Sequence, residues 1–285
     1  GAGPTGCVAA LLAQRVGLSV LLIDKRTAET FRGNAHYLNA HSLELLSHCG
    51  LNMENILAHA TPSDYAFAMA YCSSLDHVYH HTNLFTDPDI KQRYQHTGRF
   101  GGAQNIPFST VYRALLAELE QQGTPICWQT EITDIDLATN TLQACDHDDH
   151  ISSYQFRFLI GSDGVNSGIR TQLFSQPNKT THLNFVNLHL NTDFTRLITT
   201  PALLYWILNP SYPGCLVLHQ LKGQQNLQIP LFDAAEQTTP SREWATRYMN
   251  GILGKGEFDG KIERIERWSV STFVARQFHH DNIFL

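Results

Sequence analysis

Three glycines and an acidic residue near the start of the chain have the spacing of a dinucleotide-binding turn. The glycines stand at positions 1, 3 and 6. In such a turn the first glycine makes the tight strand-to-helix bend, the second lets the backbone approach a pyrophosphate, and the third allows close helix packing. Asp24 ends the next apolar run, where a carboxylate can accept hydrogen bonds from ribose hydroxyls. The pattern indicates adenine dinucleotide binding, and the alternative is a turn that is glycine-rich for backbone reasons only.

The elements that must position these residues are readable on either side of the turn. Small apolar residues over 7–17 predict a helix whose positive end faces the phosphates. The apolar run over 18–23 predicts a buried parallel strand that ends at Asp24. A doubly wound sheet also needs a central strand before the first glycine. We therefore expect a first strand that this sequence does not contain.

Composition narrows the class of protein. The chain has 285 residues, 42% of them hydrophobic and 16% charged, which is enough for two domains or for one domain with a large insertion. A net charge of −6 disfavours nucleic acid or anionic lipid as the principal partner. No apolar run approaches the roughly 18 residues of a membrane span.

Cysteine and histidine usage adds two expectations. The six cysteines are scattered without metal-ligand spacing, which predicts free thiols in a reducing compartment, and hence a cytoplasmic protein. The fifteen histidines include clusters at 77–81 and 147–150, both in polar, loop-like stretches. We therefore predict no metal site.

The remaining pattern predicts a mixture of helices and strands. Amphipathic periodicity places helices over 39–50, 109–122 and 241–253, the second capped by Ser109 or Thr110 and ended by Gly123. Residues 52–105 are expected to form short strands and loops. A β-meander over 125–160 leads into a second small-residue turn at 161–170. Strand-like runs fill 183–231 and 262–274, and a last strand covers 281–285.

The glycine turn, the stretch 34–46 and the turn at 161–170 together resemble the FAD-dependent aromatic hydroxylases. These are single-component flavoprotein monooxygenases of the para-hydroxybenzoate hydroxylase fold, and the phenol hydroxylases look most similar. The resemblance implies an α/β (α+β) fold, with a Rossmann-like FAD-binding domain over 1–182 and 271–285. An inserted antiparallel β-sheet substrate domain would cover 183–270. It also implies a fragment, because the Gly-Asp motif that follows the last strand in the family is absent.

The resemblance implies which residues bind the cofactors FAD and NAD(P)H. Asp163 and Gly164, with Arg170 behind them, match the motif that lies by the FAD pyrophosphate and is implicated in nicotinamide use. His41 stands where the family usually has arginine, and Phe108 where glutamine is common. The full set is Gly1, Ala2, Gly3, Pro4, Thr5, Gly6, Asp24, Lys25, His41, Arg113, Asp163, Gly164 and Arg170.

The activity implied by the resemblance is hydroxylation of a small phenolic substrate with NAD(P)H and O2, through a flavin C4a-hydroperoxide. His36 is the catalytic candidate, because the resemblance puts it near the flavin face; a structural histidine is the alternative. Tyr205, Trp206 and Tyr212 are candidate substrate walls, with ordinary core packing as the alternative. Epoxidation on the same scaffold, or a non-catalytic nucleotide-binding remnant, would also fit. The sequence leaves homo-oligomerisation open.

Overall fold

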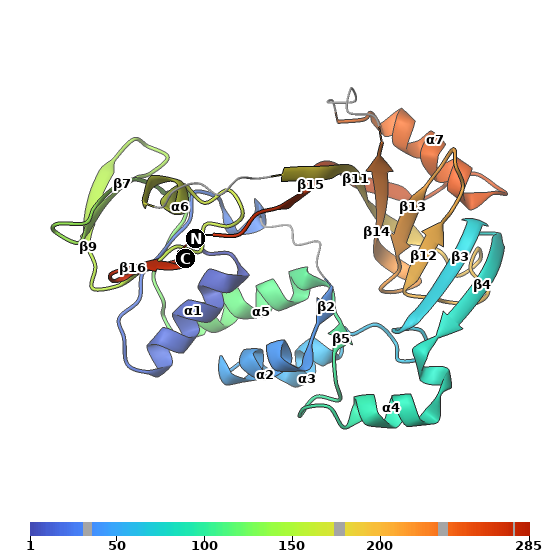
Figure 1. Ribbon diagram of the computed structural model, residues 1–285, viewed down its shortest axis with the longest axis horizontal. Helices are drawn as coiled ribbons and strands as arrows, with labels where there is room; N and C mark the ends of the chain where they lie inside the picture. Colours follow the sequence, from blue (N-terminus) through green and yellow to red (C-terminus); the bar gives the residue numbers. More distant parts are fainter. Residues whose placement is uncertain (31–35, 174–179, 233–238, 276) are drawn as a thin grey trace.

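The computed structural model describes residues 1–30, 36–173, 180–232, 239–275 and 277–285. The chain forms an α/β structure in which the glycine turn and a large β-sheet lie in different parts of the molecule (Figure 1). Two strands, β11 (Thr180–Asp193) and β15 (Lys261–Thr272), extend from the large sheet toward the other part. The predicted fold class, a dinucleotide-binding α/β part with a large second sheet, is confirmed.

The part that carries the glycine turn is built on two pairs of parallel strands. The helix that follows the turn, α1, runs from Pro4 to Arg15. Gly17 follows its cap residue and has a φ of +83°, which favours glycine. After it, β1 (Leu22–Ile23) pairs in parallel with β6 (Ile126–Cys127). The second parallel pair joins β10 (Leu159–Ile160) to β17 (Ile283–Phe284). The short strand β16 (His279–His280) adds to β17 in antiparallel orientation.

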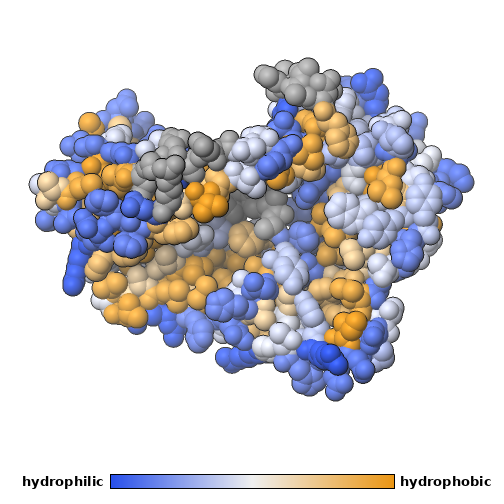
Figure 2. Space-filling view, viewed as in Figure 1, coloured by the Kyte–Doolittle hydropathy of each residue, from blue (hydrophilic) through white to orange (hydrophobic). Residues whose placement is uncertain are grey.

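The strand predicted over 18–23 is shorter than expected, because only Leu22 and Ile23 have a paired neighbour. A groove of about 450 Å³ runs along the unpaired side of this segment and reaches β10. Its lining is mostly apolar and includes Leu18, Leu21 and Ile160, which are exposed. Figure 2 shows hydrophobic side chains gathered over this part of the molecule.

Helices cover the first part and enclose its main core. The apolar faces of α1, α2 (Ala40–His48), α3 (Met53–Leu57) and α5 (Phe108–Gln121) share one cluster of buried side chains. Asn39 caps α2 by accepting a hydrogen bond from the Ser42 amide. The predicted cap of α5 at Ser109 or Thr110 is wrong: the helix starts at Phe108 and has no side-chain cap, so both residues lie inside it.

Residues 52–105 contain more helix than predicted. Besides α3, they form α4 (Pro88–Gln95), whose Asp87 cap accepts hydrogen bonds from two backbone amides. Both helices are short, so their periodicity is hard to distinguish from that of a loop. The remaining short elements of this part are η1 (Ala28–Thr30), β2 (Tyr37–Leu38), η2 (Leu84–Thr86), β5 (Gln104–Asn105) and α6 (Gly168–Leu173).

The predicted meander is present as three antiparallel strands. They are β7 (Glu131–Asp136), β8 (Thr141–Cys145) and β9 (Ile151–Gln155). The segment expected as its beginning instead forms β6, which belongs with β1. Side chains from β7, β8 and α6 share a small core with Ile23 and Ile283.

The large sheet has seven strands, and α7 (Arg242–Leu253) covers one face of it (Figure 1). Its central pairings are antiparallel, but β12 (Leu204–Ile207) pairs in parallel with β3 (Ala68–Ser74). The sheet is therefore mixed, and not purely antiparallel as predicted. Strand β3 and its neighbour β4 (His77–Asn83) come from outside residues 183–270 and complete the sheet. In spatial order the strands are β15 (Lys261–Thr272), β11 (Thr180–Asp193), β14 (Lys222–Leu231), β13 (Gly214–Val217), β12 (Leu204–Ile207), β3 (Ala68–Ser74) and β4 (His77–Asn83).

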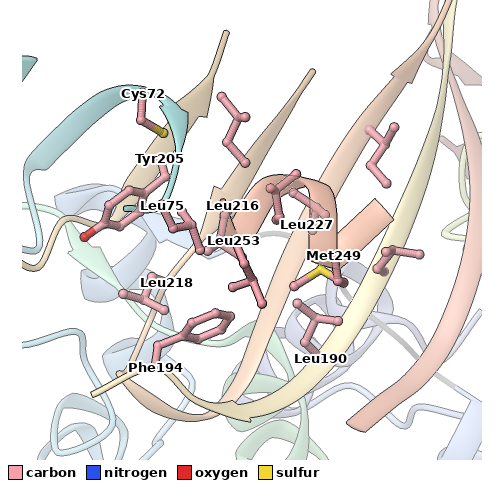
Figure 3. Packing of buried hydrophobic residues seen from close by; sticks show 14 of the residues in the cluster. Cys72, Leu75, Leu190, Phe194, Tyr205, Leu216, Leu218, Leu227, Met249 and Leu253 are labelled. Atoms are coloured by element: carbon pink, nitrogen blue, oxygen red, sulfur yellow. The ribbon is translucent and has the colours of Figure 1, made fainter. Parts of the chain in front are cut away.

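The main core of this second part lies between the sheet and α7. Figure 3 shows Leu190, Leu216 and Leu227 from the strands facing Met249 and Leu253 of the helix. Because side chains alternate along a strand, the residues between them point to the opposite face. That opposite face carries polar and aromatic side chains, among them Asn187, whose Oδ1 accepts a hydrogen bond from Trp268.

Candidate functional site

The glycine turn lies between the ends of two strands. The Ala2 amide donates to Asp24 Oδ2 at 2.8 Å, just after β1. The Ser162 hydroxyl donates to the Gly1 carbonyl at 2.8 Å, just after β10. In α/β proteins, ligands bind at the carboxyl ends of such strands. The turn therefore occupies the position in the fold where a nucleotide would be held.

The three glycines meet different surroundings. A Cβ atom on Gly1 would collide with the Ser162 carbonyl, and one on Gly6 would collide with the Gly1 carbonyl. A Cβ atom on Gly3 would meet nothing within 4 Å. Gly1 and Gly6 are thus required by close packing, whereas Gly3 faces open space. This arrangement fits a turn whose middle glycine admits a diphosphate.

At the N-terminus of α1, no side chain of the helix itself occupies the place where an anion could bind. Gly3 is the N-cap residue and supplies no side chain, and no acidic residue stands in the first turn. The first backbone N–H groups of a helix and its dipole attract anions. The residues present therefore fit a dinucleotide with its phosphates at this end of the helix.

Asp24 has a structural role in addition to the predicted contact with ribose. Its carboxylate is 6% exposed and also accepts hydrogen bonds from the Arg26 amide at 2.9 Å and from Arg26 Nε at 3.3 Å. Burial alone would raise the pKa of Asp24, but the hydrogen bonds from Arg26 and Ala2 outweigh burial and lower it. Asp24 is therefore a charged anchor for the turn, and its contact with ribose stays a prediction.

Three side chains that sequence reasoning did not select also hold this turn. Tyr112 of α5 donates its hydroxyl to the Ala2 carbonyl at 3.0 Å, and Cys7 Sγ approaches the same carbonyl at 3.2 Å. Burial raises the pKa of Tyr112 to about 12, which keeps it a donor. Ser162 is the third. Sequence spacing could not show the contacts of Tyr112 and Ser162, because these residues lie 110 and 161 positions from their partners in the turn.

The second predicted turn lies beside the first. Asp163 accepts a hydrogen bond from the Ile169 amide at 3.2 Å, which fixes the start of α6. Gly164 has a φ of +88°, a conformation that favours glycine. Arg170 donates to the Val165 carbonyl at 2.7 Å and lies 4.8 Å above the Phe273 ring. All three predicted residues thus stabilise their own loop, and their role toward a cofactor stays a prediction.

Three further cofactor candidates have exposed side chains. Lys25 forms an ion pair with Glu131 at 2.9 Å. Arg113 Nε donates to the Ser109 carbonyl at 3.3 Å within α5. His41 lies on the first turn of α2. The role of these three residues in holding phosphate stays a prediction.

His36, the catalytic candidate, is held at the junction of the two parts. Its Nδ1 lies 3.1 Å from Asn105 Oδ1, and its carbonyl accepts a hydrogen bond from the Ile106 amide at 2.7 Å. The Asn105 amide nitrogen donates to the Ala66 carbonyl at 2.7 Å. The His36 ring also contacts the His219 ring edge-on, with 4.9 Å between centroids. Burial lowers the pKa of His36, while the Asn105 contact opposes this effect.

The three aromatic candidates for the substrate wall lie on different faces of the large sheet. Tyr205 is 1% exposed in the core against α7, and its hydroxyl bonds the Thr200 carbonyl and the Ala202 amide. Figure 3 shows its side chain within that packing. Tyr212 stacks edge-on against Tyr248 of α7. Trp206 points to the face opposite α7. The core-packing alternative therefore describes Tyr205 and Tyr212 better than Trp206.

Other sequence expectations have structural outcomes as well. All six cysteines are free thiols, four of them buried, as predicted. Asp146, His147 and Asp148 place potential ligand atoms within 4.8 Å of one another, but Asp146 already accepts two backbone amides of its own turn. Within the described ranges, no helix combines the length and apolar character that a membrane crossing needs.

The glycine turn, the helix N-terminus and the acid at a strand end define a dinucleotide-binding α/β protein. Sequence comparison gives the particular family. The chain belongs to the FAD binding domain family, whose profile matches residues 1–285. A curated relative, 2,4-dichlorophenol 6-monooxygenase of Cupriavidus pinatubonensis, is 25% identical over all of this chain and 49% of its own length.

Solved structures show the same fold. The flavin-dependent monooxygenase PieE, in complex with FAD and substrate, superposes with a TM-score of 0.91 at 21% identity. Its match covers all of this chain and 51% of PieE. p-Nitrophenol 4-monooxygenase PnpA from Pseudomonas putida superposes with a TM-score of 0.79 at 15% identity. This match covers all of this chain and 70% of PnpA. The chain thus spans about half the length of the first relatives it matches.

Proposed function

We propose that this chain forms the FAD-binding part of a monooxygenase that hydroxylates a phenolic ring with NAD(P)H and O2. The observation that carries the proposal is the glycine turn fixed between Asp24 and Ser162, with open space at Gly3. The names of the relatives, which include a dichlorophenol and a nitrophenol monooxygenase, support a phenolic substrate.

The chain's own residues would divide the work as follows. The amides at the start of α1 would bind the diphosphate, and Asp24, charged under physiological conditions, would accept the ribose hydroxyls. When bound, FAD supplies the redox chemistry that takes electrons from NAD(P)H and activates O2. Asp163, Gly164 and Arg170 would border the nicotinamide cofactor, beside the first turn.

His36 would act on the substrate. Asn105 Oδ1 can only accept, and the Asn105 amide nitrogen is committed to the Ala66 carbonyl, so the proton of neutral His36 lies on Nδ1. His36 Nε2 then carries a lone pair that can accept the proton of a phenol. Loss of this proton makes the phenol ring more electron-rich, and an electron-rich ring is easier to hydroxylate.

Full-length protein tests the proposal directly. We expect the purified protein to bind FAD, to oxidise NADH or NADPH faster when a phenol is added, and to yield a product heavier by one oxygen atom. Absorbance, oxygen uptake and mass spectrometry give the three readouts. A protein that cannot be reconstituted with FAD would contradict the proposal and support the non-catalytic alternative.

A further inference from the structure

His219 is a second histidine at the junction of the two parts, and sequence reasoning did not select it. It follows β13 and precedes β14, and its carbonyl accepts the Tyr65 hydroxyl at 3.3 Å. Its ring lies edge-on to His36, with centroids 4.9 Å apart and planes at 72°. Both rings are half-buried. Removing a polar ring atom from water is costly unless the atom finds a hydrogen-bond partner, so the protonation of each ring can be read from its surroundings.

The surroundings assign a tautomer to each ring. His36 carries its proton on Nδ1, as derived above, which leaves a lone pair on Nε2. His219 Nδ1 is buried without a hydrogen-bond partner among the described residues. An unpaired buried N–H is rarer in proteins than an unpaired buried acceptor. The proton of neutral His219 therefore lies on Nε2. Burial, and secondarily the charge of His36, lowers the pKa of His219 to about 3, which keeps this ring neutral.

The two rings therefore offer complementary groups: His36 Nε2 can accept a hydrogen bond, and His219 Nε2–H can donate one. Across the described parts of the chain, neither His36 nor His219 has a hydrogen-bond partner at Nε2. A hydroxyl group needs one acceptor for its proton and one donor for its oxygen. We propose that His36 Nε2 and His219 Nε2–H together bind the hydroxyl group of the phenolic substrate. This inference rests on the proposed function and adds the residues that recognise the substrate.

The position of the pair in the fold agrees with this role. Asn105, which holds His36, stands just before α5, and Tyr112 of α5 holds the glycine turn. The helix rises about 6 Å between Phe108 and Tyr112. One rigid element therefore connects the histidine pair to the candidate FAD site, while His219 comes from the large sheet that stands opposite.

The test compares phenol with anisole, which has the same ring but no hydroxyl proton. In FAD-loaded full-length protein, we expect phenol to bind about tenfold more tightly than anisole, as read from the flavin absorbance change. His219→Phe should reduce this preference to about threefold. His219→Gln, whose amide can replace the Nε2–H donor, should restore it. His81→Gln, at a histidine bonded to the Pro201 carbonyl, is the matched control and should keep the tenfold preference.

A second measurement needs no variant. Long-range 1H–15N spectra of the protein without flavin should show His36 protonated at Nδ1 and His219 at Nε2, and phenol should shift both signals. A proton on Nδ1 of His219, or an undiminished preference in His219→Phe, would overturn the inference. If the wild type still hydroxylates phenol in that case, the proposed function stands. A wild-type protein that binds FAD but binds neither phenol nor anisole would contradict both the inference about the histidine pair and the proposed function.

Discussion

At the scale of single residues, the glycines of the turn serve two purposes: some allow close packing, and one leaves space for a ligand. Gly6 and Gly3 are three positions apart, yet a side chain on Gly6 would collide with backbone and one on Gly3 would enter open space. Gly3 has a φ of −69° and a ψ of 175°, which any residue can adopt. Binding and folding can therefore be separated by substitution.

We predict that Gly3→Ala folds normally but binds FAD at least tenfold more weakly, because its methyl group occupies the space open to the diphosphate. Gly6→Ala should lose about 2 kcal/mol or more of stability, since its methyl group overlaps the Gly1 carbonyl. Thermal unfolding and flavin titration of both variants provide the measurement. Equal effects of the two substitutions on stability would contradict the assignment.

Asp24 offers a related prediction with a different outcome. Its carboxylate anchors the Ala2 amide as well as facing the predicted ribose, so removing it should affect both the fold and the cofactor. Asp24→Ala should weaken FAD binding by roughly 1–3 kcal/mol and lower the unfolding temperature at the same time. Calorimetry without flavin, compared with flavin titration, separates the two effects. Unchanged flavin affinity would exclude the ribose contact.

The low pKa of His219 predicts a dependence of stability on pH. The unfolded chain takes up a proton at residue 219 near pH 6.5, whereas the folded chain does so only near pH 3. The unfolded state therefore binds more protons between these values, and stability is full above pH 6.5 and falls as the pH drops toward 3. The slope is about 1.4 kcal/mol per pH unit for one such group. Urea unfolding of His219→Phe should show a shallower slope over this range.

At the scale of elements, periodicity located the longer helices well. The predicted ranges for α1, α2, α5 and α7 agree with the structure to within a few residues. Strand pairing was less accessible, because the parallel partners Leu204 and Met69 are far apart in sequence. The contacts of Ser162 and Tyr112 with the turn were not predicted for the same reason, since these residues are also far from it in sequence. Sequence reasoning found the turn and its acid, while the side chains that fix them emerge only in three dimensions.

The groove between β1 and β10 matches the strand that the sequence analysis expected before Gly1. Gly1 and Ala2 contact the carboxyl ends of both strands, so a strand leading into Gly1 would pass between them. The groove's apolar lining suits a buried parallel strand.

We therefore predict that extending the chain before Gly1 by five β-branched residues raises its unfolding temperature by several degrees. The added strand would pair with two edges and cover the exposed Leu18, Leu21 and Ile160. The matched control carries proline in the middle of the extension, which removes a donor and should cancel the gain. Binding of a hydrophobic dye should decrease for the first extension only.

At the scale of the whole molecule, the cores are separate, and the histidine pair proposed to bind the substrate lies where the two parts meet. The sheet and α7 bury one cluster, while α1, α2, α3 and α5 bury another. The histidine pair connects them, with His36 beside β2 and His219 after β13. The division into a cofactor domain over 1–182 with 271–285 and a substrate domain over 183–270 stays a prediction, and β3 and β4 already join the sheet from outside the second range.

This arrangement predicts which segments respond when FAD binds. Amides at the start of α1 and over 163–169 should exchange hydrogen at least tenfold more slowly, because the cofactor covers or fixes them. If the sheet face opposite α7 covers the flavin, residues 218–221 should slow as well, although they lie in the other part. Residues of α7 itself, on the far face, serve as the internal control and should not change. Protection confined to the glycine turn and its neighbours would show that the sheet does not cover the cofactor.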